Sequence, residues 1–147
     1  MPMQIVSEAV NLAIHAMLVL SANPKRRIST VMIAEHLRVS SSHLAKVMQR
    51  LAIAGLVSSM RGTTGGFVLA CDPQKVSIAQ IVDVIDQGKF TSSCLLKMPR
   101  CKEGHCPVSD LHKNLHSIMR ERFEQVHLSD FHKNMETFVL PPENKIR

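Results

Sequence analysis

Three of the four cysteines lie close together in the sequence, in an arrangement that could bind a metal. Cys94, Cys101 and Cys106 are separated by six and then by four residues. The surrounding segment, residues 89–106, has no regular hydrophobic period, which predicts a loop. Thiolates are soft ligands that suit iron–sulfur clusters and zinc. We therefore expect a loop that carries a thiolate-bound metal; the alternative is three ordinary cysteines on a surface loop.

Histidines near this loop could complete a tetrahedral zinc site, so zinc is one alternative for the metal. His105 is adjacent to Cys106, and both could reach one ion only if the backbone bends. His112 lies six residues after Cys106, about a turn and a half into a predicted helix. Cys71 lies twenty-three residues before Cys94. We expect it to be a small buried apolar residue rather than a ligand.

A second group of residues could read DNA. The hydrophobic spacing predicts a short helix from a Ser29 cap to Leu37, with Val31, Ala34 and Leu37 facing inward. The turn Arg38-Val39-Ser40 leads to a second helix that ends near Ala54, before Gly55. Its exposed face carries donors that can reach base edges and phosphates in a major groove. These residues are Ser41, Ser42, His43, Lys46, Gln49 and Arg50.

A glycine-rich hairpin follows these two helices. Two β-prone runs, residues 56–61 and 67–70, flank a tip that contains Gly62, Gly65 and Gly66. Arg61 begins this tip, so one guanidinium can enter a minor groove while the glycine backbone approaches phosphates. The order helix, turn, helix, hairpin predicts a winged helix-turn-helix that binds double-stranded DNA. The alternative is that these residues form the solvated face of a helical domain.

The remaining segments complete a mainly helical fold with a small β-hairpin wing. We expect a first helix from about Ser7 to Ser21, and a helix that begins with the capping box Ser77-x-x-Gln80 and ends at Gly88. A long helix begins at Pro107, a short amphipathic piece covers 129–135, and the tail from Pro141 should fray. The predicted regions are a DNA-binding domain (1–88), a cysteine loop (89–107), a dimerisation region (108–137) and a tail (138–147).

The long helix carries a narrow apolar stripe on an otherwise charged surface. A stripe of this kind has too little chain around it to be covered within one subunit, so we expect it to be buried between two subunits. The sequence therefore predicts a homodimer. The central residues of the stripe are Leu111, Leu115, Ile118, Met119 and Phe123.

The positive charge is concentrated in the first half of the chain. Residues 1–75 contain eight Lys and Arg against three acids (8 − 3 = +5), and the rest contains ten against nine (10 − 9 = +1), which gives the net +6. Such a distribution favours a polyanionic partner, nucleic acid or an anionic membrane surface. The apolar run 9–22 follows Glu8 and is interrupted by Asn11 and His15, which argues against a signal peptide. We expect a cytoplasmic protein without a membrane span.

Enzyme motifs are absent from the sequence. The stretch Gly62–Gly66 lacks the Lys-Ser/Thr ending of a phosphate-binding loop. The order of residues fits neither a Ser/His/Asp triad nor a dinucleotide-binding motif, and there is no Cys-x-x-Cys pair for thiol redox catalysis. We therefore predict that the protein is not an enzyme.

Several of these motifs together resemble the Rrf-two family of bacterial winged helix-turn-helix regulators. This family includes the regulator of iron–sulfur-cluster biogenesis and the nitric-oxide-sensing repressor, and the resemblance covers roughly residues 3–135. The Arg-Gly-x-x-Gly-Gly wing is its most specific part. The matching stretches are Ile33-Ala34-Glu35, Leu44-x-x-Val47-Met48-x-x-Leu51-x-x-Ala54-Gly55-Leu56-Val57 and Ser59-x-Arg61-Gly62-x-x-Gly65-Gly66-Phe67-x-Leu69.

The resemblance implies a dimer whose long helices cross, with Arg61 in a minor groove and the second helix of the motif in a major groove. It also implies an iron–sulfur cluster, rather than zinc, on Cys94, Cys101 and Cys106. The operator affinity of such a regulator would follow redox state, nitric oxide or the supply of iron and clusters. The cysteine spacing departs from that of better-known members, so 2Fe–2S and 4Fe–4S clusters both remain open. A winged-helix regulator with structural zinc or no metal, responding to another signal, is the alternative.

The fourth ligand of the implied cluster varies among the sensory relatives. Some use a histidine just after the third cysteine, and others a carboxylate or histidine from the first helix of the partner subunit. The aligned position in that helix is Asn11, a poor ligand, but Glu8 and His15 lie one turn to either side of it. The candidates are therefore Glu8, His15, His105 and His112.

Overall fold

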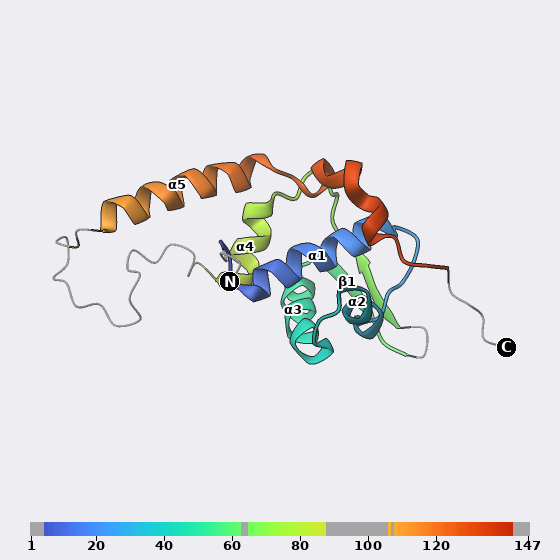
Figure 1. Ribbon diagram of the computed structural model, residues 1–147. Helices are drawn as coiled ribbons and strands as arrows, with labels where there is room; N and C mark the ends of the chain where they lie inside the picture. The colour runs from blue at the N-terminus through green and yellow to red at the C-terminus, as the bar shows by residue number, and fades with distance from the viewer. Residues whose placement is uncertain (1–4, 63–64, 88–105, 107, 143–147) are drawn as a thin grey trace.

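Helix α1 is the central element of the structure, a computed structural model that describes residues 5–62, 65–87, 106 and 108–142. It spans Glu8–Ala22, and the hydroxyl of Ser7 caps it by accepting a 3.2 Å hydrogen bond from the main-chain N–H of Val10. Helices α3 and α4 and the C-terminal segment pack around α1 (Figure 1). A helix covered on several sides must be apolar over most of its surface. Its buried residues are Val10, Leu12, Ala13, Ala16, Met17, Leu18, Val19 and Leu20.

Two helices joined by a tight turn follow α1, as predicted. α2 spans Thr30–Leu37 and α3 spans Ser41–Ile53, and the hydroxyls of Ser29 and Ser40 cap their first turns. Arg38 adopts the left-handed conformation between them, with φ at 56°, which reverses the chain over a few residues. The predicted apolar side of α3 is confirmed: Leu44, Val47, Met48 and Leu51 are buried.

The inward face of α2 differs in one residue from the prediction. Val31 is 55% exposed, whereas Ile33 is fully buried. Because successive residues of an α-helix are rotated by about 100°, Val31 lies nearly opposite Ile33. Ala34 is buried and Leu37 packs partly against the core, so these two predictions are confirmed and the inward placement of Val31 is wrong.

Gly55 ends α3 in the left-handed conformation, with φ at 74°, as predicted. The N–H of Leu56 bonds to the carbonyl of Leu51, and the N–H of Gly55 bonds to that of Ala52, each at 3.0 Å. These two bonds form a Schellman motif, which satisfies carbonyls at the end of the helix. The motif also directs the chain from α3 into the hairpin.

The hairpin consists of strands β1 (Val57–Met60) and β2 (Gly66–Leu69), which pair antiparallel. A third segment extends it, because Ile28 and Phe67 exchange hydrogen bonds at 3.0 and 2.8 Å. The fold is therefore mainly helical with a small β-hairpin wing, as predicted.

Helix α4 spans Ile78–Asp86 and begins with the predicted capping box. The main-chain N–H of Gln80 donates to the Ser77 hydroxyl at 3.3 Å, and the N–H of Ser77 donates to the Gln80 side chain at 2.9 Å. Gln87 ends the helix in the left-handed conformation, with φ at 49°. Gly88, which was predicted to end it, lies outside the described residues.

Helix α5 spans Ser109–Gln125 and has no buried residue along its length. Figure 1 shows that its N-terminal end projects past α4, away from the other helices. Its C-terminal end is held to the domain, because Ile78 donates to the carbonyl of Val126 at 2.9 Å and Leu128 donates to that of Val76 at 3.0 Å. Pro107, the predicted first residue of this helix, lies outside the described residues.

The chain after α5 returns to the N-terminal helices and packs on α1. A 3-10 helical segment, η2, spans Leu128–Phe138, and Leu128 and Met135 are buried in the same core as α1. It corresponds to the short amphipathic piece that was predicted around residues 129–135. The region predicted for dimerisation, 108–137, thus contains both a projecting helix and a segment that belongs to the main core.

The tail was predicted to fray from Pro141, and most of it, residues 143–147, lies outside the described residues; the chain just before it is held to the domain. Leu140 is buried, and its N–H donates to the Asn23 side chain at 3.2 Å. Arg26 donates to the carbonyl of Pro141 at 2.6 Å. The tail therefore lies against the loop between α1 and α2. Throughout the part of the chain that the structure describes, no helix is both long and apolar enough to cross a membrane.

Candidate nucleic-acid interface and cysteine segment

The predicted reading face of α3 is exposed in the structure. Leu44, Val47, Met48 and Leu51 fix the rotation of the helix by burying its opposite side. The hydroxyl of Ser40 accepts a hydrogen bond from the N–H of His43 and also pairs with the Ser42 hydroxyl at 2.9 Å. His43 is half-buried, and the other predicted contact residues are exposed: Ser41, Ser42, Lys46, Gln49 and Arg50. One side of α3 thus presents hydroxyls, an amide and two cations to solvent.

Two side chains of this face also bind other helices of the domain. The imidazole of His43 lies 3.7 Å from the carboxylate of Glu8, at the start of α1. The guanidinium of Arg50 donates to the carbonyl of Ile85 at 3.1 Å, at the end of α4. The start of α1 and the end of α4 are themselves joined, because the hydroxyl of Ser7 donates to Asp86 at 2.9 Å. The position of α3 is therefore coupled to the residues that directly precede the cysteine segment.

The wing places Arg61 on an exposed turn between its strands. Gly62 has φ at 114°, in a region that favours glycine, and an added Cβ there would meet nothing within 4 Å. At Gly65 an added Cβ would lie 2.6 Å from the carbonyl oxygen of Met60. At Gly66 it would lie 2.9 Å from the main chain of Ile28. The last two glycines are thus required by close approaches within the wing, a role that the sequence reasoning did not identify.

Arg27 is a further basic residue near the wing, and it was not among the residues predicted to contact DNA. It is exposed, and its guanidinium contacts the sulfur of Met60, next to Arg61 in the wing. Nothing in the sequence connects Arg27 with the hairpin, because the two are more than thirty residues apart. The Ile28–Phe67 pairing supplies this connection.

The cysteine segment is described only at its end. Cys94, Cys101 and His105 lie outside the described residues. Cys106 is a half-buried free thiol, and its carbonyl accepts a 3.1 Å hydrogen bond from Ser109 at the start of α5. Within residues 5–62, 65–87, 106 and 108–142, no three His, Cys, Asp or Glu side chains are grouped so that they could hold a metal. Thiolates are soft ligands, so the three predicted cysteines suit an iron–sulfur cluster by their donor chemistry.

Cys71 is half-buried at the end of the wing, as a free thiol. Burial raises the pKa of its thiol, and Asp72 raises it further, although a main-chain hydrogen bond opposes them. A thiol with a raised pKa is less often the thiolate that binds metals. Cys71 packs against the core as a small apolar residue would, but it is partly buried rather than fully buried as predicted.

The two candidate ligands on α1 line one cavity of about 260 Å³. Glu8 and His15 lie in its wall with Asn11, and the apolar side of the cavity is formed by Leu12, Leu37 and Val39. The imidazole of His15 bonds to the carbonyl of Asn11 at 2.7 Å. The carboxylate and the imidazole thus border one cavity between α1 and the turn that precedes α3.

His112, the remaining described candidate, lies on α5 beside His116. Their ring centroids are 4.7 Å apart, with the rings tilted by 48°. Burial lowers the pKa of His116, and the neighbouring His112 lowers it further. The sequence reasoning did not single out His116.

Arg120 joins α5 to α4. Its guanidinium donates to both carboxylate oxygens of Asp83, at 2.5 and 2.9 Å, and to Glu124 at 2.8 Å. These hydrogen bonds raise the pKa of Arg120 above its ordinary value, so the cation is maintained. A bidentate pair fixes direction as well as distance. Arg120 and Asp83 therefore help to set the angle at which α5 leaves the domain.

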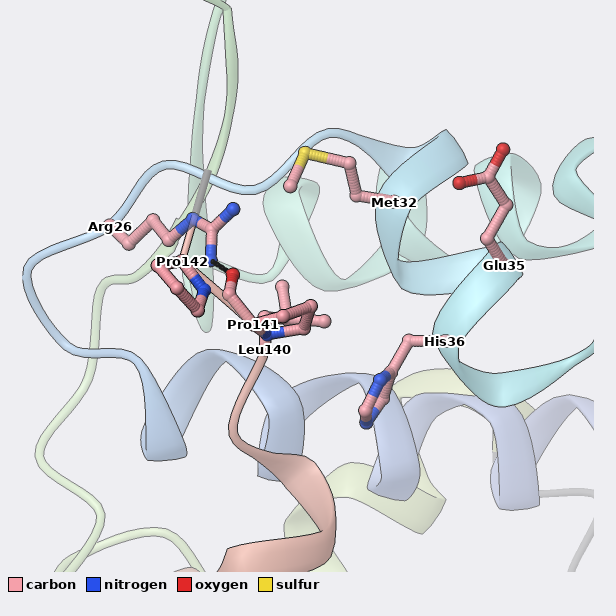
Figure 2. A pocket seen from close by; sticks show the side chains of 7 residues that line it. All are labelled: Arg26, Met32, Glu35, His36, Leu140, Pro141 and Pro142. Atoms are coloured by element: carbon pink, nitrogen blue, oxygen red, sulfur yellow. Dashed lines mark hydrogen bonds between the residues drawn. The ribbon is translucent and has the colours of Figure 1, made fainter. Parts of the chain in front are cut away.

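A second cavity, of about 410 Å³, lies between α2 and the C-terminal tail (Figure 2). Met32, Glu35 and His36 project from α2 on one side, and Arg26 reaches the main chain of Pro141 on the other. The imidazole of His36 also bonds to the carbonyl of Thr137 at 2.8 Å. The C-terminal tail is thereby attached to the first helix of the helix-turn-helix.

Comparison with known proteins agrees with the fold and the DNA-reading motif. Residues 6–134 match the Rrf2 family model, which is described as an iron-dependent transcriptional regulator. The chain is 30% identical over 140 residues to a protein of Aquifex aeolicus described as an HTH-type transcriptional regulator, covering 93% of this chain and 97% of that protein. It is 30% identical over 105 residues to the regulator IscR of Xenorhabdus nematophila, covering 71% and 63% of the two chains.

Among solved structures, the global cysteine regulator CymR of B. subtilis has a similar fold. The TM-score is 0.70 at 22% identity, over 89% of this chain and 98% of that one. The family and these relatives are transcriptional regulators, and the prediction that the chain is not an enzyme is confirmed. Because the family model covers most of the chain, from α1 into η2, this protein belongs to the Rrf2 family of DNA-binding transcriptional regulators.

Proposed function

We propose that this protein is a homodimeric regulator of transcription whose operator affinity is controlled by an iron–sulfur cluster on Cys94, Cys101 and Cys106. The observation that carries the proposal is the position of these thiols. They occupy the segment between the end of α4 and the start of α5. The family model, described as iron-dependent, spans this segment and favours iron over zinc.

When bound, the cluster would supply a soft iron–sulfide centre that is lost when iron is scarce or modified by nitric oxide or oxygen. Three thiolates leave a ligand position open. The cavity bordered by Glu8 and His15 offers a carboxylate and an imidazole. Because the N-terminal end of α5 projects away from its own domain, we propose that the partner subunit supplies this ligand.

The contacts of α3 provide a route from the cluster to DNA. Arg50 reaches the carbonyl of Ile85, and Asp86 accepts from Ser7 at the start of α1. Only two residues, Gln87 and Gly88, separate Asp86 from the start of the cysteine segment at residue 89. A loop that changes conformation with cluster state would act directly on the end of α4, and through Arg50 on the orientation of α3.

The dimer interface that we propose is the apolar stripe of α5. Leu111, Leu115 and Ile118 are 60%, 54% and 59% exposed in the single chain. The other stripe residues, Met119 and Phe123, pack partly against the core and would hold α5 to its own subunit. Apolar side chains exposed in a row along one helix are typical of a surface that another chain covers.

The decisive experiment is anaerobic purification of the full chain, with iron, sulfide and zinc analysis, an absorption spectrum and operator binding before and after cluster removal. We expect a coloured protein with iron and sulfide whose DNA affinity changes when the cluster is lost. Replacing Cys94, Cys101 or Cys106 by Ala should abolish the visible absorption, whereas Cys71→Ala, the matched control, should retain it. A colourless protein with one zinc per chain, or bleaching by Cys71→Ala, would contradict the cluster assignment.

A further inference from the structure

Arg27 brings a second guanidinium to the wing from the loop between α1 and α2. The segment that carries it pairs with strand β2, because Ile28 and Phe67 exchange two main-chain hydrogen bonds, at 3.0 and 2.8 Å. The guanidinium of Arg27 contacts the sulfur of Met60, the last residue of β1. Since Met60 directly precedes Arg61, the two arginines lie at the same end of the hairpin.

The side chain of Arg27 reaches this end of the hairpin across a glycine. Met60 pairs with Gly66 in the register of the two strands. Residues that are paired directly in an antiparallel ladder point to the same face of the sheet. Gly66 adds no side chain to that face, so the arginine can cross β2 and meet Met60 on β1. The contact therefore follows from the same glycine that allows Ile28 to approach the wing.

The charge of Arg27 is accessible to an anionic partner. Arg27 is exposed, and the neighbouring Met60 is 52% exposed. Among the residues that the structure describes, no carboxylate forms an ion pair with Arg27. A guanidinium presents several N–H donors in one plane and can donate to two oxygens of a phosphate. An exposed guanidinium beside the wing is thus suited to the backbone of DNA.

We propose that Arg27 is a further DNA contact, which binds a backbone phosphate at the edge of the minor groove that the wing is predicted to enter. This rests on the proposed function, in which the protein binds an operator. A minor groove is about 6 Å wide and is bordered by phosphates on both sides. Arg27 starts from the segment beside β2, about 4.8 Å from that strand, whereas Arg61 lies at the tip. From the side of the wing it meets phosphates rather than base edges, and it therefore adds affinity for DNA of any sequence.

The test is binding of the full chain to a short, fluorescein-labelled duplex of mixed sequence, measured by fluorescence anisotropy at several KCl concentrations. We expect Arg27→Ala to weaken binding roughly tenfold at low salt, as the loss of a hydrogen bond to a charged group would. The slope of log K against log salt should fall in magnitude by about 0.9 per bound subunit, the contribution of one phosphate contact. Arg27→Lys retains the charge and should retain this slope. Circular dichroism checks that each variant is folded.

Lys25→Ala is the matched control, because it removes an exposed cation from the same loop. Lys25 lies in a turn that is closed by a 3.0 Å hydrogen bond from Arg26 to the carbonyl of Asn23. Asn23 is bound to the C-terminal tail, through the N–H of Leu140 at 3.2 Å. This turn is therefore attached to the tail and not to the wing, and Lys25→Ala should change the salt slope much less than Arg27→Ala does.

Met60→Ala separates a DNA contact from a role in positioning the wing. It removes the side chain that Arg27 touches but leaves the charge, so the salt slope should stay at the parental value. The proposal would be overturned by parental affinity and slope in Arg27→Ala, or by an equal loss of slope in Met60→Ala or Lys25→Ala. A parent chain that does not bind the duplex even at low salt would contradict DNA binding itself, and the proposed function with it.

Discussion

Arg50, on the exposed side of α3, donates a 3.1 Å hydrogen bond to the main-chain carbonyl of Ile85 at the end of α4. This bond connects the helix that we assign to the major groove with the last turn before the cysteine segment. Arg50 is therefore a positioning residue for α3, whether or not it also reaches a phosphate. A carbonyl at the C-terminal end of a helix is a favourable partner for a cation, because the helix dipole is negative there.

We predict that Arg50→Ala lowers the free energy of unfolding by about 1 kcal/mol, the typical net contribution of one such hydrogen bond. It should also reduce the difference in operator affinity between the cluster-bound and cluster-free protein. Lys46→Ala is the matched control, because it removes an exposed cation from the same helix. Urea unfolding and fluorescence anisotropy with operator DNA check both effects. Equal stability of the two variants would exclude the positioning role.

Arg61→Ala should weaken operator binding by roughly 1–3 kcal/mol if the guanidinium reads a groove. The physical reason is that Arg61 is exposed at the turn of the wing, where its guanidinium is accessible to DNA. Lys75→Ala removes the same charge from an exposed site beyond the wing and should have a smaller effect. Binding isotherms at several salt concentrations separate the two variants. An unchanged affinity and salt slope for Arg61→Ala would contradict the wing assignment.

Gly66→Ala should destabilise the wing by about 1–3 kcal/mol, because φ is 156° and the added Cβ would lie 2.9 Å from the backbone of Ile28. Gly62→Ala should cost less, since φ there is 114° but its Cβ would meet nothing within 4 Å. Thermal unfolding of both variants provides the comparison. If Gly62→Ala were the more destabilised protein, the close approach to Ile28 would not be what requires glycine at position 66.

Ile118→Asp should convert the dimer to monomers or to insoluble protein, because it places a carboxylate in the centre of the apolar stripe. Ser117→Asp introduces the same charge at a neighbouring exposed position of α5, outside the stripe, and should remain dimeric. Sedimentation velocity distinguishes the two species. A dimeric Ile118→Asp variant would show that the interface lies elsewhere.

Arg120→Ala and Asp83→Asn should each weaken the attachment of α5 to α4. The two side chains are 38% and 44% exposed, so screening by solvent limits their coupling free energy to about 0.5–1 kcal/mol. A double-mutant cycle on the free energy of unfolding measures this coupling. The angle of α5 would also change, which should alter the preferred spacing of operator half-sites. Additive effects of the two substitutions would mean that the pair does not act as a unit.

Local sequence signals predicted the helical motif well, because their physical causes are local. Ser29, Ser40 and Ser77 begin helices because each can cap the first turn, and Gly55 ends α3 because it adopts a positive φ. The apolar period of α3 also fixed which side of that helix is buried. The inward placement of Val31 was predicted wrongly, because a helix as short as α2 has few residues from which to determine which of its sides is buried.

Other features were decided by contacts between segments far apart in the chain. The sequence by itself determined the winged helix-turn-helix, the exposed residues of α3, the apolar stripe of α5 and the thiol-rich segment. Only the tertiary structure decided that η2 and the tail return to α1 and α2, that Ile28 pairs with Phe67, and that Arg50 reaches Ile85. The reason is that periodicity records which side of an element is buried, whereas the partner that buries it depends on how the whole chain packs.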